Sequence, residues 1–262
     1  MDIAAIYDQL VADHFDEDLF QIYGDARIEA WEQIRSQGRQ GSLEILDLGM
    51  GTGEWLLKLQ SLFPEANCHG VELSQKMMEV AKKKFAATGH KVDIIHEDAN
   101  HFGRHIAAAA MDLITIHFVL NYVDRPTVFA EAQRCLKPRG LFSVASSTHA
   151  CFEALHDVAK QFLPAEEIKA QFLIPEDLQE VEHDMEKVGL RVVAKKLFRK
   201  KLVFQDFDHF YHFAMHSGWL ADPVFLKHMS QERLPLYREF GKTLFPLEDH
   251  FEAAIVLGEK TS

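Results

Sequence analysis

The hydrophobic and polar positions along the chain alternate between short apolar runs and longer segments with helical spacing. The apolar runs predict strands at 43–48, 67–72, 91–95, 111–117, 139–146, 190–204 and 250–258. The segments with helical spacing predict helices near 2–14, 20–37, 53–63, 74–87, 125–136 and 176–188. Strands that alternate with helices indicate βαβ units. The pattern therefore predicts an α/β fold around a mostly parallel sheet.

Two segments depart from this alternation. Residues 149–175 predict a helix and loop ending at Pro164 and Pro175, and residues 205–248 predict two helices broken at 221–223 and by Pro235. The second segment contains "FDHFYHFAMHSGWL", which is rich in aromatic and histidine side chains. Such an insertion can bury a substrate of mixed polarity. We therefore expect both segments to form a helical lid over a substrate.

Composition narrows the class of protein. The 262 residues are 47% hydrophobic, which suits one large α/β domain with a buried core. No apolar run approaches the roughly 20 residues of a membrane span, and the acidic N-terminal segment does not resemble a signal peptide. The three cysteines, Cys68, Cys135 and Cys151, lack CxxC spacing, so a disulfide framework or zinc ribbon is not expected. We expect a cytoplasmic protein with no membrane partner.

The formal net charge of −12 disfavours nucleic acid as the main partner, because phosphate recognition requires a basic face. The segment "KKLFRKK" at 195–201 carries five cations in seven residues. We interpret it as the solvated face of a strand.

The stretch "ILDLGMGTGEWLLKL" at 45–59 places Gly49, Gly51 and Gly53 between a strand and a helix. Three glycines at alternate positions indicate a sharp turn and a close approach of the backbone to a ligand. Dinucleotide enzymes use the spacing GxGxxG, with a pyrophosphate at the helix N-terminus. Here Glu54 stands where the third glycine would fall, and its carboxylate would repel a pyrophosphate. The loop suits a less negatively charged ligand.

Two acidic residues end the next strands. Glu72 closes the second strand, where a fixed carboxylate can accept both hydroxyls of a ribose. Asp98 follows the third strand, where it can accept a hydrogen bond from an adenine amine while Ala99 offers its backbone N–H. Glu72 alone does not separate NAD from other adenosyl ligands.

Five landmarks in order resemble the class I S-adenosylmethionine-dependent methyltransferases. They are residues 47–53, Glu72 with "LS", "EDA" at 97–99, "MDLITIHFVLNYV" at 111–123 and "AEAQRCLKPRGLFSVA" at 130–145, in which 137–140 stand for a turn before the fifth strand. The resemblance implies a Rossmann-like, seven-stranded, mostly parallel sheet with an antiparallel edge hairpin (190–204 with 250–258), helices on both faces and a helical lid insertion. It divides a single domain, 1–262, into N-terminal cap helices (1–40), a cofactor-binding core (41–148) and lid segments (149–175 and 205–248).

The resemblance also implies the cofactor S-adenosylmethionine, its product S-adenosylhomocysteine, and a set of contacts. The glycine loop and Asp47 would hold the methionine part, Glu72 the ribose and Asp98 the adenine. The implied cofactor-binding residues are Tyr7, Tyr23, Arg27, Asp47, Gly49, Met50, Gly51, Gly53, Glu72, Leu73, Met77, Asp98, Ala99, His117 and Phe118. Ordinary core packing is the alternative for Leu73, Met77 and Phe118.

Histidines are the candidate bases. His117 and His149 follow strands four and five, at the sheet edge that faces the ligand crevice. A carboxylate acceptor would need no base. The residues expected to contact substrate are Tyr122, His209, Tyr211, His212, Met215, His216 and Trp219. His209, His212 and His216 share one helix face, but no carboxylate or cysteine completes a metal signature, so no metal is expected.

The leading hypothesis is O- or N-methylation of a small molecule or a carrier-bound acyl group. A loose resemblance to malonyl-acyl carrier protein O-methyltransferases, carried by "PRGLF" and "PLEDHFEAAIVLGEK", would make Lys195, Lys196, Arg199, Lys200 and Lys201 a docking patch for acyl carrier protein. The absence of NPPY or DPPY after strand four disfavours methylation of nucleic-acid bases. The alternatives are an RNA or protein methyltransferase, a catalytically inactive cofactor-binding subunit and a nicotinamide oxidoreductase. The sequence predicts no oligomeric state.

Overall fold

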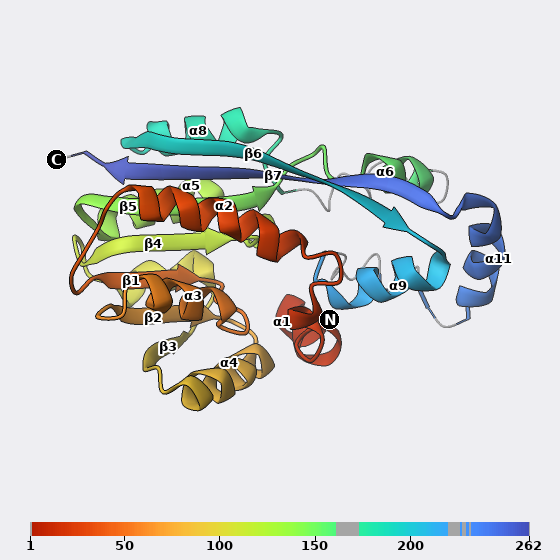
Figure 1. Ribbon diagram of the computed structural model, residues 1–262, viewed down its shortest axis with the longest axis horizontal. Helices are drawn as coiled ribbons and strands as arrows, with labels where there is room; N and C mark the ends of the chain where they lie inside the picture. Colours follow the sequence, from red (N-terminus) through yellow and green to blue (C-terminus); the bar gives the residue numbers. More distant parts are fainter. Residues whose placement is uncertain (1, 161–172, 220–225, 227–228, 231, 262) are drawn as a thin grey trace.

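The computed structural model describes residues 2–160, 173–219, 226, 229–230 and 232–261 (Figure 1). The expected lid features at Pro164 and 221–223 lie outside these residues. Seven strands form one sheet in the order β3-β2-β1-β4-β5-β7-β6. Their bounds are β1 Glu44–Leu48, β2 Asn67–Glu72, β3 Val92–His96, β4 Met111–His117, β5 Leu136–Ser147, β6 Leu190–Phe204 and β7 Leu247–Lys260. Strands β1 to β5 are parallel and β7 is antiparallel to both β5 and β6, which confirms the predicted fold class.

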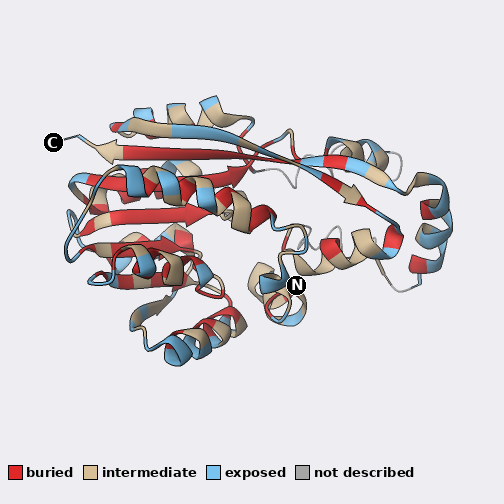
Figure 2. Cartoon of the chain, in the orientation of Figure 1, coloured by how far each residue is buried: buried red, intermediate tan, exposed pale blue. Residues whose placement is uncertain are grey.

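Helices cover both faces of the sheet (Figure 1). Their bounds are α1 Ile3–Ile6, α2 Ile22–Ser36, α3 Glu54–Leu62, α4 Gln75–Thr88, α5 Arg125–Cys135, α6 Glu153–Ala159, α8 Leu178–Lys187, α9 Phe207–His216 and α11 Leu234–Leu244. Successive strand residues face opposite sides. Ile45 therefore packs with the cluster that contains α2 and α3, and Leu46 with the cluster that contains α5 and α8. The buried band runs along the central strands (Figure 2).

Two local expectations were only partly right. The helix expected over 2–14 is present over 3–11, but it changes from α-helix at Ile3–Ile6 to a π-helical turn at Tyr7–Val11, and a separate 3₁₀ turn follows at Phe15–Glu17. Asp8 lies in the π-helical turn and reaches the start of α4, where its Oδ1 accepts hydrogen bonds from Ser74 Oγ (2.5 Å) and Lys76 N (3.0 Å). The turn expected at 137–140 is an irregularity within β5: Arg139 adopts a φ of 65°, and the strand resumes its pairing with β4 at Leu141. The register between β4 and β5 shifts next to it.

Strands β6 and β7 form an arm that extends past the rest of the sheet (Figure 1). They pair from Leu190 opposite Lys260 to Phe204 opposite Leu247, whereas β5 stops pairing with β7 at Ala253. Helix α11 precedes β7 and lies at the outer end of the arm, whereas α9 begins at the end of β6 and runs back toward the N-terminal segment (Figure 1). Within the described part of the chain, no helix is long and apolar enough to cross a bilayer.

Candidate active site

The glycine loop lies between β1 and α3, at the carboxyl edge of the sheet. Gly49, Gly51 and Gly53 have φ values of 68°, 57° and 78°, a region that favours glycine. A Cβ on Gly49 would lie 2.4 Å from Val119 Cγ2, whereas a Cβ on Gly51 would meet only Phe15 at 3.8 Å. Gly49 is therefore required by the fold itself, and Gly51 leaves an open backbone surface toward a ligand.

Glu72 fixes this loop from the neighbouring strand. Its Oε2 accepts a hydrogen bond from Gly51 N, and its Oε1 accepts bonds from Leu73 N and Ser74 N, all at 2.8 Å. Burial raises the pKa of Glu72, and the three N–H bonds oppose that rise. The backbone thus locks the carboxylate in one orientation at the end of β2.

A cavity of about 530 Å³ opens beside the loop, where the carboxyl ends of the parallel strands meet. Twelve of the fifteen expected cofactor residues line it: Tyr7, Tyr23, Arg27, Gly49, Gly51, Glu72, Leu73, Met77, Asp98, Ala99, His117 and Phe118. Asp98 Oδ1 accepts hydrogen bonds from Asn100 N and Nδ2, both at 2.8 Å. The two carboxylates expected to hold an adenosine therefore face one cavity.

The other three expected cofactor residues do not line this cavity. Asp47 accepts a hydrogen bond from Thr115 Oγ1 at 2.6 Å, and burial raises its pKa to about 7. The loop's N–H groups bond to Val71 O and Glu72 instead, so Asp47 is not the loop's direct anchor. Met50 points into the core, where its Sδ occupies the space that a Cβ on Gly70 would need. Gly53 is the N-cap of α3 and packs against Phe85.

Arg27 is the cationic side chain of the cavity wall. Its Nε is buried with no hydrogen-bond partner among the described residues, and its guanidinium lies 5.8 Å from the centroid of Phe118. Burial lowers the pKa of Arg27, and nearby carboxylates oppose that change. A buried donor without a partner is costly. The position therefore fits the carboxylate of a bound ligand.

Three tyrosines tie the N-terminal cap to the end of α9 above the cavity. Tyr7 and Tyr122 share a hydrogen bond between their hydroxyls at 3.2 Å, and Tyr122 also donates to Gly218 O at 3.2 Å. Tyr23 donates to Ser217 O at 3.1 Å. Burial raises the pKa of Tyr7 well above its usual range, so this hydroxyl stays neutral. Tyr122 and Trp219 are the two expected substrate residues that line the cavity.

The two candidate bases lie in different environments. His117 ends β4 and faces the cavity; its Nε2 lies 3.0 Å from Ser143 Oγ, and its buried Nδ1 has no partner among the described residues. Burial, with the charge of Arg27, holds the pKa of His117 well below its usual range, so the imidazole is neutral. His149 is exposed and lies outside the cavity lining. Its backbone N–H bonds to Pro175 O and Glu176 O.

The remaining lid residues, His209, Tyr211, His212, Met215 and His216, are not part of the described cavity lining. His209 Nδ1 accepts a hydrogen bond from Gln205 N at 3.2 Å, and Tyr211 stacks on Phe207. The face that carries His212 and His216 turns toward the N-terminal segment instead of the cavity.

Sequence reasoning missed several polar residues of the cavity. Asn121, Ser146 and Ser147 line it from the ends of β4 and β5, and Ser74 lines it from the start of α4. The rule that the carboxyl ends of parallel strands share one edge would have identified the two serines at the end of strand five.

Comparisons with known proteins agree with this geometry. Residues 45–140 match the family described as a methyltransferase domain. A malonyl-[acyl-carrier protein] O-methyltransferase from Halalkalibacterium halodurans is 33% identical over 134 residues, which cover 50% of this chain and 48% of the relative. A ubiquinone/menaquinone biosynthesis C-methyltransferase from Desulfotalea psychrophila is 34% identical over 108 residues, covering 41% of this chain and 42% of the relative. The chain thus spans about half the length of these curated relatives.

Solved structures share the fold across most of the chain. The YcgJ protein of Bacillus subtilis has a TM-score of 0.62 at 18% identity, with 90% of this chain and 99% of that chain covered. A Haemonchus contortus phosphoethanolamine N-methyltransferase, solved with S-adenosyl-L-methionine, has a TM-score of 0.60 at 16% identity, with 100% of this chain and 60% of that chain covered. These likenesses extend the shared architecture beyond residues 45–140.

Proposed function

We propose that this chain, which carries a class I S-adenosylmethionine-dependent methyltransferase domain, transfers a methyl group from that cofactor to a small molecule bound in the same cavity. One observation carries the proposal. Glu72, Asp98 and the open face of Gly51 line a single cavity, and this set matches the ribose, adenine and methionine parts of the cofactor.

The charges of the cavity support this cofactor over a dinucleotide. Glu72, Glu97 and Asp98 line one part of it and would repel a pyrophosphate. Arg27, with its unpartnered Nε, would hold the cofactor's carboxylate. Leu73 and Met77 come from the β2–α4 connection and would contact the adenine ring.

The chain's own residues contribute mainly positioning. The bound cofactor supplies an electrophilic methyl group on a sulfonium, and the acceptor atom must lie in line with the S–CH₃ bond. The hydrogen bonds of Tyr7, Tyr23 and Tyr122 hold the N-terminal cap and the end of α9 together over the cavity. His117 is neutral and can accept or donate a hydrogen bond without charging the site. For an acceptor that must lose a proton, this imidazole would be the base.

The cavity's walls suggest the acceptor's character. Apolar side chains line it alongside the polar groups, among them Ile3, Phe118, Ile174 and Trp219. Such a mixture favours a small acceptor with an apolar body and one nucleophilic group.

A carrier-bound acyl group is the second candidate, because one relative is named as a malonyl-[acyl-carrier protein] O-methyltransferase. The expected docking patch on β6 is largely neutralised within the chain. Lys195 pairs with Glu182 at 2.6 Å, Arg199 with Glu252 at 2.7 Å, Lys200 with Asp25 at 2.6 Å and Lys201 with Glu248 at 2.7 Å. An acidic carrier would have to compete with these pairs, so we place the small-molecule acceptor first.

Calorimetric titration with S-adenosylhomocysteine tests the cofactor assignment. Glu72→Gln should weaken binding by roughly a hundredfold, since it removes the charged acceptor of two hydroxyls. Glu79→Gln is a matched control, because Glu79 lies exposed on α4 away from the cavity lining. Equal affinity in all three proteins would refute the assignment.

Transfer of a labelled methyl group to acceptors in a cell extract tests the reaction. Label released as methanol by mild alkali would identify a carboxylate acceptor, and alkali-stable label would identify an N-, C- or ether-methyl product. Absence of any transfer, with cofactor binding intact, would contradict the proposed reaction and favour a cofactor-binding subunit.

A further inference from the structure

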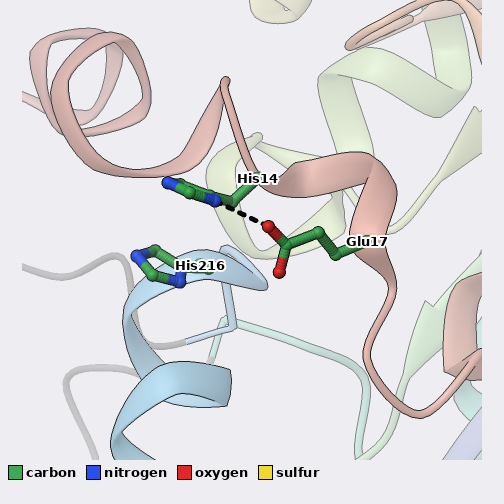
Figure 3. Close-up of side chains that lie close together, drawn as sticks. All are labelled: His14, Glu17 and His216. Carbon is green, nitrogen blue, oxygen red and sulfur yellow. Dashed lines mark hydrogen bonds and ion pairs between the residues drawn. The ribbon is translucent and has the colours of Figure 1, made fainter.

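Three histidines and one glutamate meet where the N-terminal segment contacts the end of α9. His14 Nδ1 lies 2.7 Å from Glu17 Oε1, and His212 Nε2 lies 2.8 Å from Glu17 Oε2. His216 Nδ1 lies 3.2 Å from His212 Nδ1, and its ring stacks on His14 with centroids 4.1 Å apart. Figure 3 shows His14 and His216 facing Glu17 from two different segments.

The spacing of three of these side chains suits a metal ion. One ligand atom from each of His14, Glu17 and His216 lies within 4.8 Å of the others. Ligand atoms around a tetrahedral zinc ion are separated by about 3.4 Å, given bonds near 2.0–2.1 Å. His14 and Glu17 are 42% and 44% exposed, so small side-chain rotations can bring the atoms to that spacing. An ion would replace the proton that now joins His14 to Glu17.

His212 supports two of these groups. Its contacts form a chain in which Nε2–H donates to Glu17 and Nδ1 accepts from Nδ1–H of His216. The hydrogen bond with His212 fixes the orientation of the His216 ring, and a neutral ring keeps one nitrogen with a lone pair for coordination. Hydrogen bonds of this kind commonly orient metal ligands, so His212 is a positioning residue.

We propose that His14, Glu17 and His216 bind a divalent transition-metal ion of the zinc type. Two imidazoles and one carboxylate match the borderline donors that Zn²⁺ prefers, whereas Mg²⁺ and Ca²⁺ prefer oxygen-rich sites. Three protein ligands leave a fourth position for water. The site goes beyond the proposed methyl transfer, because none of its ligands lines the cavity.

The ion would join two segments that cover the cavity. His216 directly precedes Ser217 and Gly218, whose carbonyl oxygens accept hydrogen bonds from Tyr23 and Tyr122. Both tyrosines line the cavity. A bound ion would therefore restrain α9 against residues 14–17, the two segments that cover the cavity. Metal binding should then tighten the binding of a ligand in the cavity.

Titration of the untagged, metal-free full chain with Co²⁺ and Zn²⁺ tests the site. We expect one equivalent of metal with micromolar affinity, and visible d–d absorption bands for the cobalt form. His14→Ala and Glu17→Gln should each weaken binding by at least about tenfold, and His212→Gln by about tenfold through lost orientation. Glu17→Gln preserves side-chain size, so it tests the site even if the alanine variant folds poorly.

His105→Ala is the matched control, because His105 forms a similar exposed contact with Glu97 at 3.1 Å elsewhere on the surface. It should leave metal affinity unchanged. Binding weaker than about 1 mM, or equal affinity in the wild-type and Glu17→Gln proteins, would overturn the proposal. Loss of binding in His105→Ala would place the metal at the other surface and would also overturn it. Metal binding is read without any acceptor, so its failure is separate from failure of methyl transfer.

Discussion

Replacing Asp47 with asparagine should make the folded protein less sensitive to rising pH. Asp47 is 3% exposed within β1, and its described hydrogen bond comes from Thr115 Oγ1. Burial raises its pKa to about 7, whereas an aspartate in an unfolded chain titrates near 3.9. Between these values the folded state keeps a proton that the unfolded chain releases.

The sign and size of the effect follow from linkage. Because the folded state binds more protons between about pH 4 and pH 7, stability falls as pH rises through that window and is constant above it. Three pKa units correspond to about 4 kcal/mol. Asparagine imitates the protonated carboxyl, and its extra N–H group costs about 1–3 kcal/mol if it finds no partner. The free energy of unfolding of Asp47→Asn, measured relative to that of wild type, should therefore rise by about 4 kcal/mol as the pH is raised from 4 to 8.

Urea unfolding followed by tryptophan fluorescence at pH 4, 5, 6, 7 and 8 measures this difference. Comparing the variant with wild type at each pH cancels the titration of the other carboxyl groups. Glu65→Gln is the control, because Glu65 is exposed and forms no hydrogen bond or ion pair among the described residues, so it should give a difference that is constant with pH. A constant difference for Asp47→Asn would refute the reasoning.

Further predictions concern the cavity. Glu72 has a raised pKa and must be ionised to accept both hydroxyls of the ribose. The affinity for S-adenosylhomocysteine should therefore begin to fall, as the pH is lowered, at a pH above the ordinary titration range of glutamate. Calorimetry that shows constant affinity down to pH 4.5 would contradict this. Gly49→Ala should lower the melting temperature through its contact with Val119, whereas Gly51→Ala should mainly weaken cofactor binding; equal melting temperatures would argue against the distinction. Arg27→Gln should weaken S-adenosylhomocysteine by about tenfold or more but leave methylthioadenosine, which lacks the carboxylate, unaffected; equal losses for both ligands would show another role.

The sheet could be predicted because its signals are local. Apolar runs such as 43–48 and 111–117 closely match β1 and β4, and the family resemblance supplied the antiparallel edge. The form of the N-terminal helix could not be predicted. Its spacing is helical, but the chain is π-helical at Tyr7–Val11, where Asp8 bonds to the start of α4, 66 residues away in sequence. Tertiary contacts of this kind leave no periodic signal.

The residues of the candidate site, like the elements of the fold, could be predicted only in part. Glu72, Asp98, Gly49 and Gly51 follow from strand ends and spacing, and these four line the cavity, whereas Met50 and Gly53 pack against the core. The lid histidines could not be placed, because helical spacing identifies a shared face but not what that face contacts. His212 and His216 meet Glu17, almost 200 residues earlier in the chain, so the carboxylate of the proposed metal site could not be identified from sequence.

The arm of β6 and β7 has a consequence for how such a protein can change its acceptor. Phe204 pairs with Leu247, so the chain leaves the sheet and returns to it at adjacent positions. Everything between these residues, α9 and α11 included, is one insert closed by a paired stem, while the glycine loop and Glu72 lie on other strands. The insert reaches the cavity through Gly218 and Trp219, and Tyr23 and Tyr122 bond to its backbone, so a change in the insert changes one wall of the cavity and leaves Glu72 and the glycine loop on their own strands. For the proposed methyl transfer, substitutions in this insert should therefore alter the choice of acceptor more than the binding of the cofactor.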